Sequence, residues 1–391
     1  MWRIVFQAIP AIAWCVSVLV VVMPLKLKRQ TALIVAFALA AAFGKFAFFA
    51  VVGGDGFNPN LPQFVVWFCG WAYATAMLLT GFAVAVVLAD VAMRLCRNPV
   101  RLCVKRLRIV LLAAFAALVS LWGMYEGVCI PSVKRVEIGC KDLPPAFDGY
   151  RIVHLSDLHC STAARRGRFE KIVERVNALD ADLIAITGDF VDGRVSDRGD
   201  DLAPLAGLRA KDGVVACTGN HEAYWGWHEW RTQFHEWGIV FPEETGARAI
   251  RRGDDMIVVG GLADPAFMRW SPMVHKNADA AFADTPFGSF RILLHHRPCT
   301  AAIKSEAADV RLQLSGHTHG GAMPGISRLV ARANEGRTRG LYEFAPGRFL
   351  YLSPGTGQWA GFPLRLFNPA EITEIILHSG GDSGKPSEQS P

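Results

Sequence analysis

Gly-His-Thr-His-Gly-Gly at residues 316–321 follows the apolar run 310–314 (VRLQL) after a single serine, and this junction decides the fold. Four other apolar runs end in the same manner, at Asp157-Leu158-His159, Gly188-Asp189-Phe190-Val191-Asp192, Gly219-Asn220-His221-Glu222 and His295-His296. Short apolar runs that alternate with helical or loop segments predict layered sheets with helices outside. Open sheets bind ligands at the carboxyl edge of their strands, so the five junctions should meet at one site.

The rest of the second half repeats this alternation. Apolar spacing of Ile172, Val173, Val176 and Leu179 predicts a helix over 169–179. The expected strands are 151–156, 183–187, 214–218, 256–259, 290–294, 310–314, 349–352 and 372–377. We therefore expect an α/β domain over 129–378 and a disordered tail over 379–391, where Gly, Ser and Pro dominate.

The charges divide the chain of 391 residues into two parts. Residues 1–128 hold 11 Lys and Arg against 3 Asp and Glu, whereas the remainder holds 30 against 32. The formal net charge of +6 therefore belongs to the first part, and the second lacks the basic excess that a nucleic-acid surface needs. All 11 histidines lie between His154 and His378, so the chemistry is expected in the second part.

The first part reads as a bundle of about four transmembrane helices, because a span needs about 20 mainly apolar residues. The expected spans are 4–23, 31–52, 63–92 and 109–128. The first span has only Arg3 before it, and more spans follow, so we interpret it as a retained helix and not a signal peptide. Lys45 and Asp90 are the polar exceptions; snorkelling to the interface explains Asp90 better than Lys45.

The polar junctions have the composition of a transition-metal site. In extended backbone, residues i and i+2 point to the same side, so Asp157 with His159, and His317 with His319, can each offer two ligands to one cavity. Mixed carboxylate, imidazole and amide ligands suit Mn, Fe or Zn better than Ca.

In this order, the motifs SDLH, GDFVD, GNHE, LLHHRP and GHTHGG resemble those of the calcineurin-like metallophosphoesterases. The resemblance covers about residues 150–377 and extends to the branch of the family that carries N-terminal membrane helices. It implies a two-sheet β-sandwich flanked by helices, and a dinuclear metal-dependent phosphoesterase, a hydrolase acting on ester bonds.

The resemblance also assigns roles to the motif residues, with two divalent ions as cofactors. One ion would be held by Asp157, His159 and His319, the other by Asn220, His296 and His317, and Asp189 would bridge both. His221 would contact the phosphoryl group and assist the leaving oxygen, and Asp192 would orient His221. A metal-bridged hydroxide would attack phosphorus, since two ions about 3.5–4 Å apart lower the pKa of a shared water.

Several residues leave alternatives open. Adjacent strand residues face opposite sides, and the family motif aligns with His296 as the ligand, which leaves His295 as a neighbouring pocket residue. Ala322 stands where the family often has Gln, which puts the local pocket in doubt. Arg165, Arg166 and Arg168 form either a phosphate clamp or a solvated loop. Core packing and substrate contact are both open for Tyr224, Trp225, Trp227, Trp230 and Trp237. A disulfide between Cys129 and Cys140 is also open.

The function expected from these features is hydrolysis of a phosphoester or phosphoanhydride in a lipid-linked or envelope substrate. The partners are then a phosphorylated small molecule or lipid and the bilayer, with no nucleic acid. The alternatives are a non-catalytic membrane sensor that binds metal or ligand, and a phosphodiesterase acting on nucleotides. A transporter is disfavoured because the spans hold few ionisable residues and no repeat.

Basic residues in short loops predict the topology, because such loops stay in the cytoplasm. They occur between the first two spans (Lys26, Lys28, Arg29) and between the last two (Arg94, Arg97, Arg101, Lys105, Arg106, Arg108), but not in the 53–62 loop. With four spans, the N-terminus and the domain after Val128 lie outside. We expect a multi-pass protein of the bacterial inner membrane with a periplasmic catalytic domain.

Overall fold

The computed structural model describes residues 2–97, 100–267 and 277–380. The chain forms two compact units, which are described separately. Unit 1 comprises Met1–Glu126 with Ala360–Leu364, and unit 2 comprises Gly127–Trp359 with Arg365–Pro391. The sequence interpretation placed the boundary at 128/129 and did not assign residues 360–364 to the membrane part.

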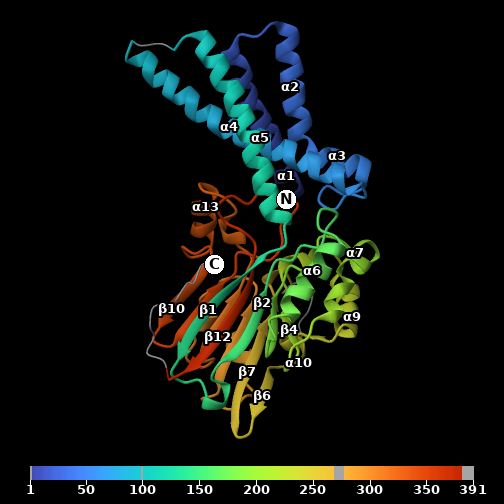
Figure 1. The fold of residues 1–391 in the computed structure, drawn as a ribbon, viewed down its shortest axis with the longest axis vertical. Helices are drawn as coiled ribbons and strands as arrows, with labels where there is room; N and C mark the ends of the chain where they lie inside the picture. The colour runs from blue at the N-terminus through green and yellow to red at the C-terminus, as the bar shows by residue number, and fades with distance from the viewer. Residues whose placement is uncertain (1, 98–99, 268–276, 381–391) are drawn as a thin grey trace. The chain divides into compact units, whose positions relative to one another are not determined.

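Unit 1 is helical, and its helices are drawn in blue and cyan in Figure 1. They are α1 (Trp2–Ser17), which continues through a π-helical segment at Val18–Val22 and a 3-10 turn at Met23–Leu25, then α2 (Arg29–Phe43), α3 (Lys45–Gly53), α4 (Gln63–Leu95) and α5 (Leu102–Val128). Three segments are long and apolar enough to cross a membrane: Ala8–Leu25, Gln63–Leu95 and Leu102–Val128. The predicted apolar N-terminal bundle is thereby confirmed.

The second expected span, 31–52, is not one straight helix. α2 and α3 meet at Gly44 with a bend of 63°, the geometry of a broken span or of a re-entrant loop. The break follows from Gly44, whose amide closes the last turn of α2 on the Ala40 carbonyl at 2.8 Å and whose ψ of 5° leaves the helical range.

The two charged residues inside apolar helices have partners within unit 1. Asp90 forms ion pairs with Lys105 at 3.0 Å and Arg108 at 3.1 Å, which join α4 to the start of α5. Lys45 donates from Nζ to the Ala360 carbonyl at 3.0 Å and lies 4.8 Å from the centre of the Tyr73 ring. Both charged residues therefore have partners within unit 1.

Unit 2 contains two six-stranded sheets. The first has the order β1 (Ser132–Cys140), β12 (Glu371–Ser379), β2 (Tyr150–Leu155), β3 (Leu183–Thr187), β4 (Val214–Cys217) and β5 (Ile239–Val240). The second has the order β10 (Gly340–Ala345), β11 (Arg348–Leu352), β9 (Val310–Ser315), β8 (Phe290–His295), β7 (Asp255–Leu262) and β6 (Arg248–Arg252). Strands β2 to β5 are parallel to one another, as are β7, β8, β9 and β11.

The two sheets pack face to face over one core. Ile152 and Val215 of the first sheet share a buried cluster with Ile292 and Leu312 of the second. Residues of opposite parity, such as Leu155 and Ile184, point to the other face of the first sheet. The strands are therefore buried on both faces, which explains their nearly continuous apolar sequences.

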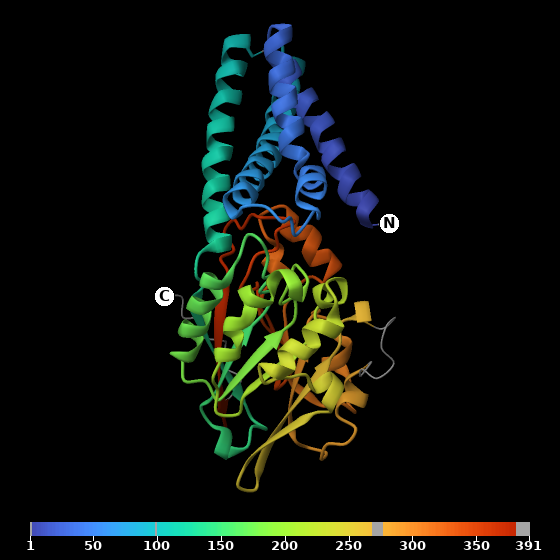
Figure 2. The same ribbon diagram turned by 90° about the vertical axis from the view of Figure 1, so that its right-hand side faces the viewer.

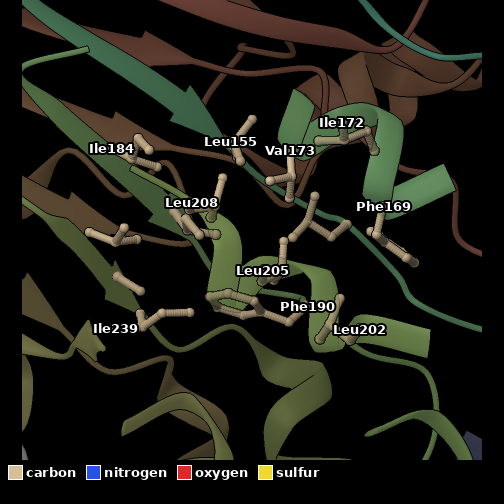
Figure 3. Close-up of a cluster of buried hydrophobic side chains, with 14 of the residues drawn as sticks. Leu155, Phe169, Ile172, Val173, Ile184, Phe190, Leu202, Leu205, Leu208 and Ile239 are labelled. Carbon is tan, nitrogen blue, oxygen red and sulfur yellow. The ribbon is translucent and has the colours of Figure 1, made fainter. Parts of the chain in front are cut away.

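Helices cover the outer face of the first sheet. The helices and single turns of unit 2 are α6 (Arg166–Asn177), α7 (Val195–Leu202), α8 (Asn220–Tyr224), α9 (Trp227–Glu236), α10 (Pro242–Thr245), α11 (Ala278–Ala281), α12 (Ala301–Lys304), α13 (Ile326–Ala333) and 3-10 turns at Pro145–Phe147, Ala203–Gly207, Pro265–Phe267 and His319–Gly321. Figures 1 and 2 show α6, α7 and α9 side by side over this face. Phe169 and Ile172 of α6 meet Leu155 and Phe190 in the core between them (Figure 3).

The two-sheet sandwich with flanking helices confirms the expected fold, and every expected strand is present. The strands β1, β5, β6 and β10 were not predicted. Ser379, assigned to a disordered tail, pairs with Cys140 at the end of β12, and the rest of that tail from 381 lies outside the described residues. Cys140 is buried at the end of β1, and the structure contains no disulfide from it to Cys129.

Candidate metal centre

All five polar junctions meet at one place in unit 2. Asp157 and His159 follow β2, Asp189 and Asp192 follow β3, and Asn220 and His221 begin α8 after β4. His296 follows β8, and His317 and His319 follow β9. The first six residues come from one sheet and the last three from the other, so the site lies where the carboxyl ends of both sheets come together.

The sequence argument assumed extended backbone at this site, but the structure shows tight turns. Positive φ angles occur at Asp157 (52°), His159 (46°), Asp189 (54°), His317 (72°) and His319 (47°). Non-glycine residues adopt this left-handed conformation at a cost of about 1–3 kcal/mol each, and such residues cluster at functional sites. The expected pairing of residues i and i+2 therefore arises from tight turns beyond the strands.

One cluster of possible ligands comprises Asp157, His159 and His319, whose ligand atoms lie within 4.8 Å of one another. The Nε2 atoms of the two histidines are 3.2 Å apart, and His319 Nε2 is 3.6 Å from Asp157 Oδ1. Asp157 and His159 are fully buried, which excludes bulk water from stabilising their polar atoms.

A second cluster comprises Asp189, His296 and His317. His296 Nε2 lies 3.2 Å from Asp189 Oδ2 and 3.1 Å from His317 Nδ1. Asp189 Oδ2 is also 3.8 Å from His159 Nε2, so this one oxygen faces both clusters. Asn220 Oδ1, at the start of α8, is buried and accepts no hydrogen bond from the described residues, which leaves a lone pair for a cation.

These distances fit shared ions. Ligand bonds of about 2.0–2.2 Å place neighbouring ligand atoms of one ion about 3.0–3.5 Å apart. His296 Nδ1 lies 2.7 Å from the Thr187 carbonyl, and His159 Nδ1 lies 3.2 Å from Asp192 Oδ1. Each contact fixes the proton on Nδ1 and leaves the Nε2 lone pair facing the cluster, the usual arrangement of a metal-bound histidine.

The pKa values of Asp189 and His296 are shifted by their mutual attraction. Burial disfavours charge on Asp189 and on His296, yet the pKa of Asp189 is held well below its ordinary value by His296, His221 and His159. Burial alone would lower the pKa of His296, but Asp189 and Asp157 raise it to about 10. Bound cations would neutralise the charge of the same carboxylates. The histidines would then lose their extra protons and could bind the ions as neutral ligands.

Asp192 lies behind His221 and His159. Its Oδ1 is 2.5 Å from His221 Nδ1 and 3.2 Å from His159 Nδ1. Burial would lower the pKa of His221, but Asp189 and Asp192 raise it to about 9. These carboxylates favour the protonated form of His221, whose Nε2 lies 3.9 Å from Asp189 Oδ2.

The remaining open residues are placed outside the clusters. His295 is buried, and none of the three groups of candidate metal ligands contains it. Arg168 is also buried and donates to the carbonyls of Cys129 and Thr356, whereas Arg166 pairs with Glu170 on the surface. Arg165 donates to the Thr162 carbonyl at 3.5 Å, so all three arginines have protein partners, and the phosphate clamp stays a prediction.

The aromatic cluster divides into core and rim. Trp230 is fully buried and donates to the Gly193 carbonyl at 2.9 Å, and Trp225, Trp227 and Trp237 pack partly buried against the same core. Tyr224 is 62% exposed, and its ring centre lies 5.5 Å from that of His221. Core packing therefore accounts for the tryptophans, and Tyr224 borders the site.

Sequence reasoning missed two residues that shape this site. Glu222 accepts hydrogen bonds from the amides of Asp189, Phe190 and Gly219, and thereby ties the loop after β3 to the loop after β4. Trp359 lies with its ring centre 6.0 Å from that of His221. The acid of the GNHE motif was a visible signal for Glu222, whereas nothing local in the sequence connects Trp359 to His221.

Residues 150–321 match the calcineurin-like phosphoesterase family. The two sheets, the order of the ligand-bearing loops and this match together show that the chain belongs to the calcineurin-like metallophosphoesterases. The family is one of phosphoester hydrolases, and the ligand clusters are those of a metal-binding site.

Its relatives include proteins with membrane segments. The chain is 32% identical over 68% of its length to a transmembrane protein with metallophosphoesterase domain from Danio rerio, and 32% identical over 70% to its Bos taurus counterpart. It covers 62% and 63% of those proteins. An uncharacterized metallophosphoesterase of Helicobacter pylori is 31% identical over 65% of this chain and 66% of its own length.

Proposed function

We propose that the protein hydrolyses a phosphoester or phosphoanhydride bond with two divalent ions, Mn, Fe or Zn, in unit 2. The observation that carries this proposal is the pair of ligand clusters facing one oxygen, Asp189 Oδ2. Asp157, His159 and His319 would hold one ion, and Asn220, His296 and His317 the other. Bound there, the ions would supply charge neutralisation of the phosphoryl oxygens and an activated water.

His221 supplies the acid. It is 13% exposed in its side chain and hydrogen-bonded to Asp192, so its Nε2 is free to donate a proton to the oxygen that leaves. Asp192 keeps the ring oriented and the proton in place. Tyr224 and Trp359 flank the same ring and present an aromatic border to the group that departs.

The substrate class we favour is lipid-linked or otherwise part of the cell envelope. The apolar helices of unit 1 keep the hydrolase at a bilayer, where such substrates occur. A nucleotide phosphodiesterase remains the second enzymatic candidate, because an aromatic border also stacks on bases. A sensor without catalysis is the third, and the intact acid pair of His221 and Asp192 speaks against it.

The topology we propose places unit 2 outside the cytoplasm. α5 starts in the basic segment and leads directly to unit 2, so the argument depends on that segment lying inside. Arg106 of α5 donates to the carbonyls of Leu25 at 3.0 Å and Lys26 at 3.1 Å. The two basic loops are therefore neighbours, which supports one common side for both and a crossing by the bent pair α2–α3.

The test of activity uses the full chain purified in detergent and loaded with Mn. A phosphate monoester, a phosphate diester and a lipid pyrophosphate are compared, with Asp189→Asn as the inactive control. We expect metal-dependent turnover of at least one substrate that the control lacks. If the folded, metal-loaded protein is inactive on all three substrates, the enzyme hypothesis is wrong and the sensor hypothesis replaces it.

The test of topology uses reporters fused after residue 130. Alkaline phosphatase should be active there, and a fluorescent protein that folds only in the cytoplasm should be dark. The opposite pair of results would place unit 2 inside and remove the argument for an envelope substrate.

A further inference from the structure

The short helix α13 has an apolar face that unit 2 does not bury. Ile326, Leu329, Val330 and Ala333 recur at the spacing of one helical face, and no residue of the helix is buried. Leu329 is 64% exposed. A helix whose apolar face is left open inside its own domain requires a partner for that face.

The opposite face of α13 is basic. Arg328 and Arg332 lie one turn apart and are exposed, and among the described residues neither forms an ion pair with an acidic side chain. Residues 322–348 hold five arginines and two glutamates, although residues 129–391 as a whole carry more acidic than basic residues. This local positive charge is complementary to an anionic surface.

α13 is attached to the metal centre through a ligand loop. Its Ser327 packs so closely on Gly321 that a Cβ there would lie 2.7 Å from the Ser327 Cβ. Gly321 ends the turn that starts at His319, so the helix is held beside a candidate ligand. Figures 1 and 2 both place α13 at one end of unit 2, beyond the strands.

A second apolar residue stands beside the same loop. Phe367 is 70% exposed with a φ of 57°, and its carbonyl accepts a hydrogen bond from Arg339 at 3.3 Å. The next residue, Asn368, donates to the His319 carbonyl. Arg339 thus brings one more positive charge to this side of the loop.

We propose that α13 and Phe367 dock unit 2 on an anionic lipid surface, with Leu329 and Phe367 entering the interface and Arg328, Arg332 and Arg339 contacting headgroup phosphates. An amphipathic helix with basic residues binds bilayers in this manner. The apolar helices of the same chain keep a bilayer within reach, which raises the effective lipid concentration. Docking brings the His319 loop to the height of the headgroups, where a lipid-linked phosphate would lie.

The test places the photoreactive residue benzoylphenylalanine at position 329 of the full chain. The protein is reconstituted in nanodiscs of phosphatidylcholine with or without phosphatidylglycerol, and lipid adducts are measured by mass spectrometry after illumination. Position 287, where Phe287 is 87% exposed, carries the same residue in the control. We expect adducts at 329 that increase with phosphatidylglycerol, and few at 287.

Charge removal tests the arginines. Arg328→Gln with Arg332→Gln should lower adducts at 329 about thirtyfold, since the two basic residues together contribute about 2 kcal/mol at an anionic surface. The matched control is Arg209→Gln with Arg251→Gln, two exposed arginines elsewhere on unit 2. Equal adducts at 329 and 287, adducts indifferent to phosphatidylglycerol, or cross-links to protein instead of lipid would each overturn the proposal.

The docking proposal rests on the proposed function only for its substrate, and the two can be tested separately. The cross-linking is repeated in Asp189→Asn, which is expected to abolish turnover and changes no residue of α13. Adducts that persist in this variant support the docking whatever the substrate proves to be. Loss of adducts in the arginine variant with full turnover of a soluble diester would show that docking serves access to the membrane and not the chemistry.

Discussion

Asp192→Asn is the substitution that separates proton donation from metal binding. The side chain keeps its size, but its charge is lost, and the 2.5 Å contact to His221 becomes a neutral hydrogen bond. A hydrogen bond to a charged group is worth about 1.5–3 kcal/mol. The neutral hydrogen bond that remains is worth about 0.5–1.5 kcal/mol, so the substitution costs about 1–1.5 kcal/mol. At 1.36 kcal/mol per tenfold in rate, we expect turnover to fall by about 5- to 13-fold.

The pH profile should move in a defined direction. Burial lowers the pKa of His221, and Asp189 and Asp192 raise it to about 9. A proton donor acts below its pKa, so activity falls as the pH rises through that value. Removing the charge of Asp192 lowers the pKa, and the basic limb of the profile should shift toward lower pH.

The assay measures turnover from pH 6 to 10 together with bound metal in the same samples. Asp192 also contacts His159, but at 3.2 Å, so we expect metal content to fall much less than turnover. If metal is lost in proportion to activity and the basic limb stays in place, Asp192 acts through the ligand His159, and the assignment of His221 as its principal partner is wrong.

Three further outcomes follow from the same geometry. Asp189→Asn should lose both activity and metal, whereas His221→Ala should lose activity and retain metal, and equal metal loss in elemental analysis would contradict these roles. His296→Ala should lower metal content far more than His295→Ala, because only His296 lies at the cluster; the reverse ranking would refute the assignment. Glu222→Gln should weaken metal affinity by about 10- to 100-fold in titrations, since it orients the Asp189 loop, and an unchanged affinity would refute that role.

The strand positions were predictable because burial on both faces makes most of each strand's sequence apolar. The strands that escaped prediction are those with partly exposed faces, such as β10 and β6, whose burial is mixed. Their sequences carry arginine or glutamate and resemble loops. The helix break at Gly44 escaped for another reason: the apolar sequence continues through it, and only the backbone turns.

The residues of the candidate site could be predicted from the sequence because each follows a strand. Their backbone geometry could not be predicted. The argument from extended backbone led to the pairing of Asp157 with His159 by the wrong route, since both have positive φ. Gly316 shows what determines the turn: a Cβ there would overlap the Ser156 hydroxyl and the Asp157 carboxylate. Such close approaches depend on residues distant in sequence, and no local pattern reports them.

The division of ligands between the two sheets has a consequence for biosynthesis. Asp157, Asp189 and Asn220 emerge from the ribosome early, while His296, His317 and His319 emerge only after β7. A nascent chain thus exposes buried-type carboxylates before their partners exist. Capture of ions by the complete set of ligands would therefore be a late event in maturation.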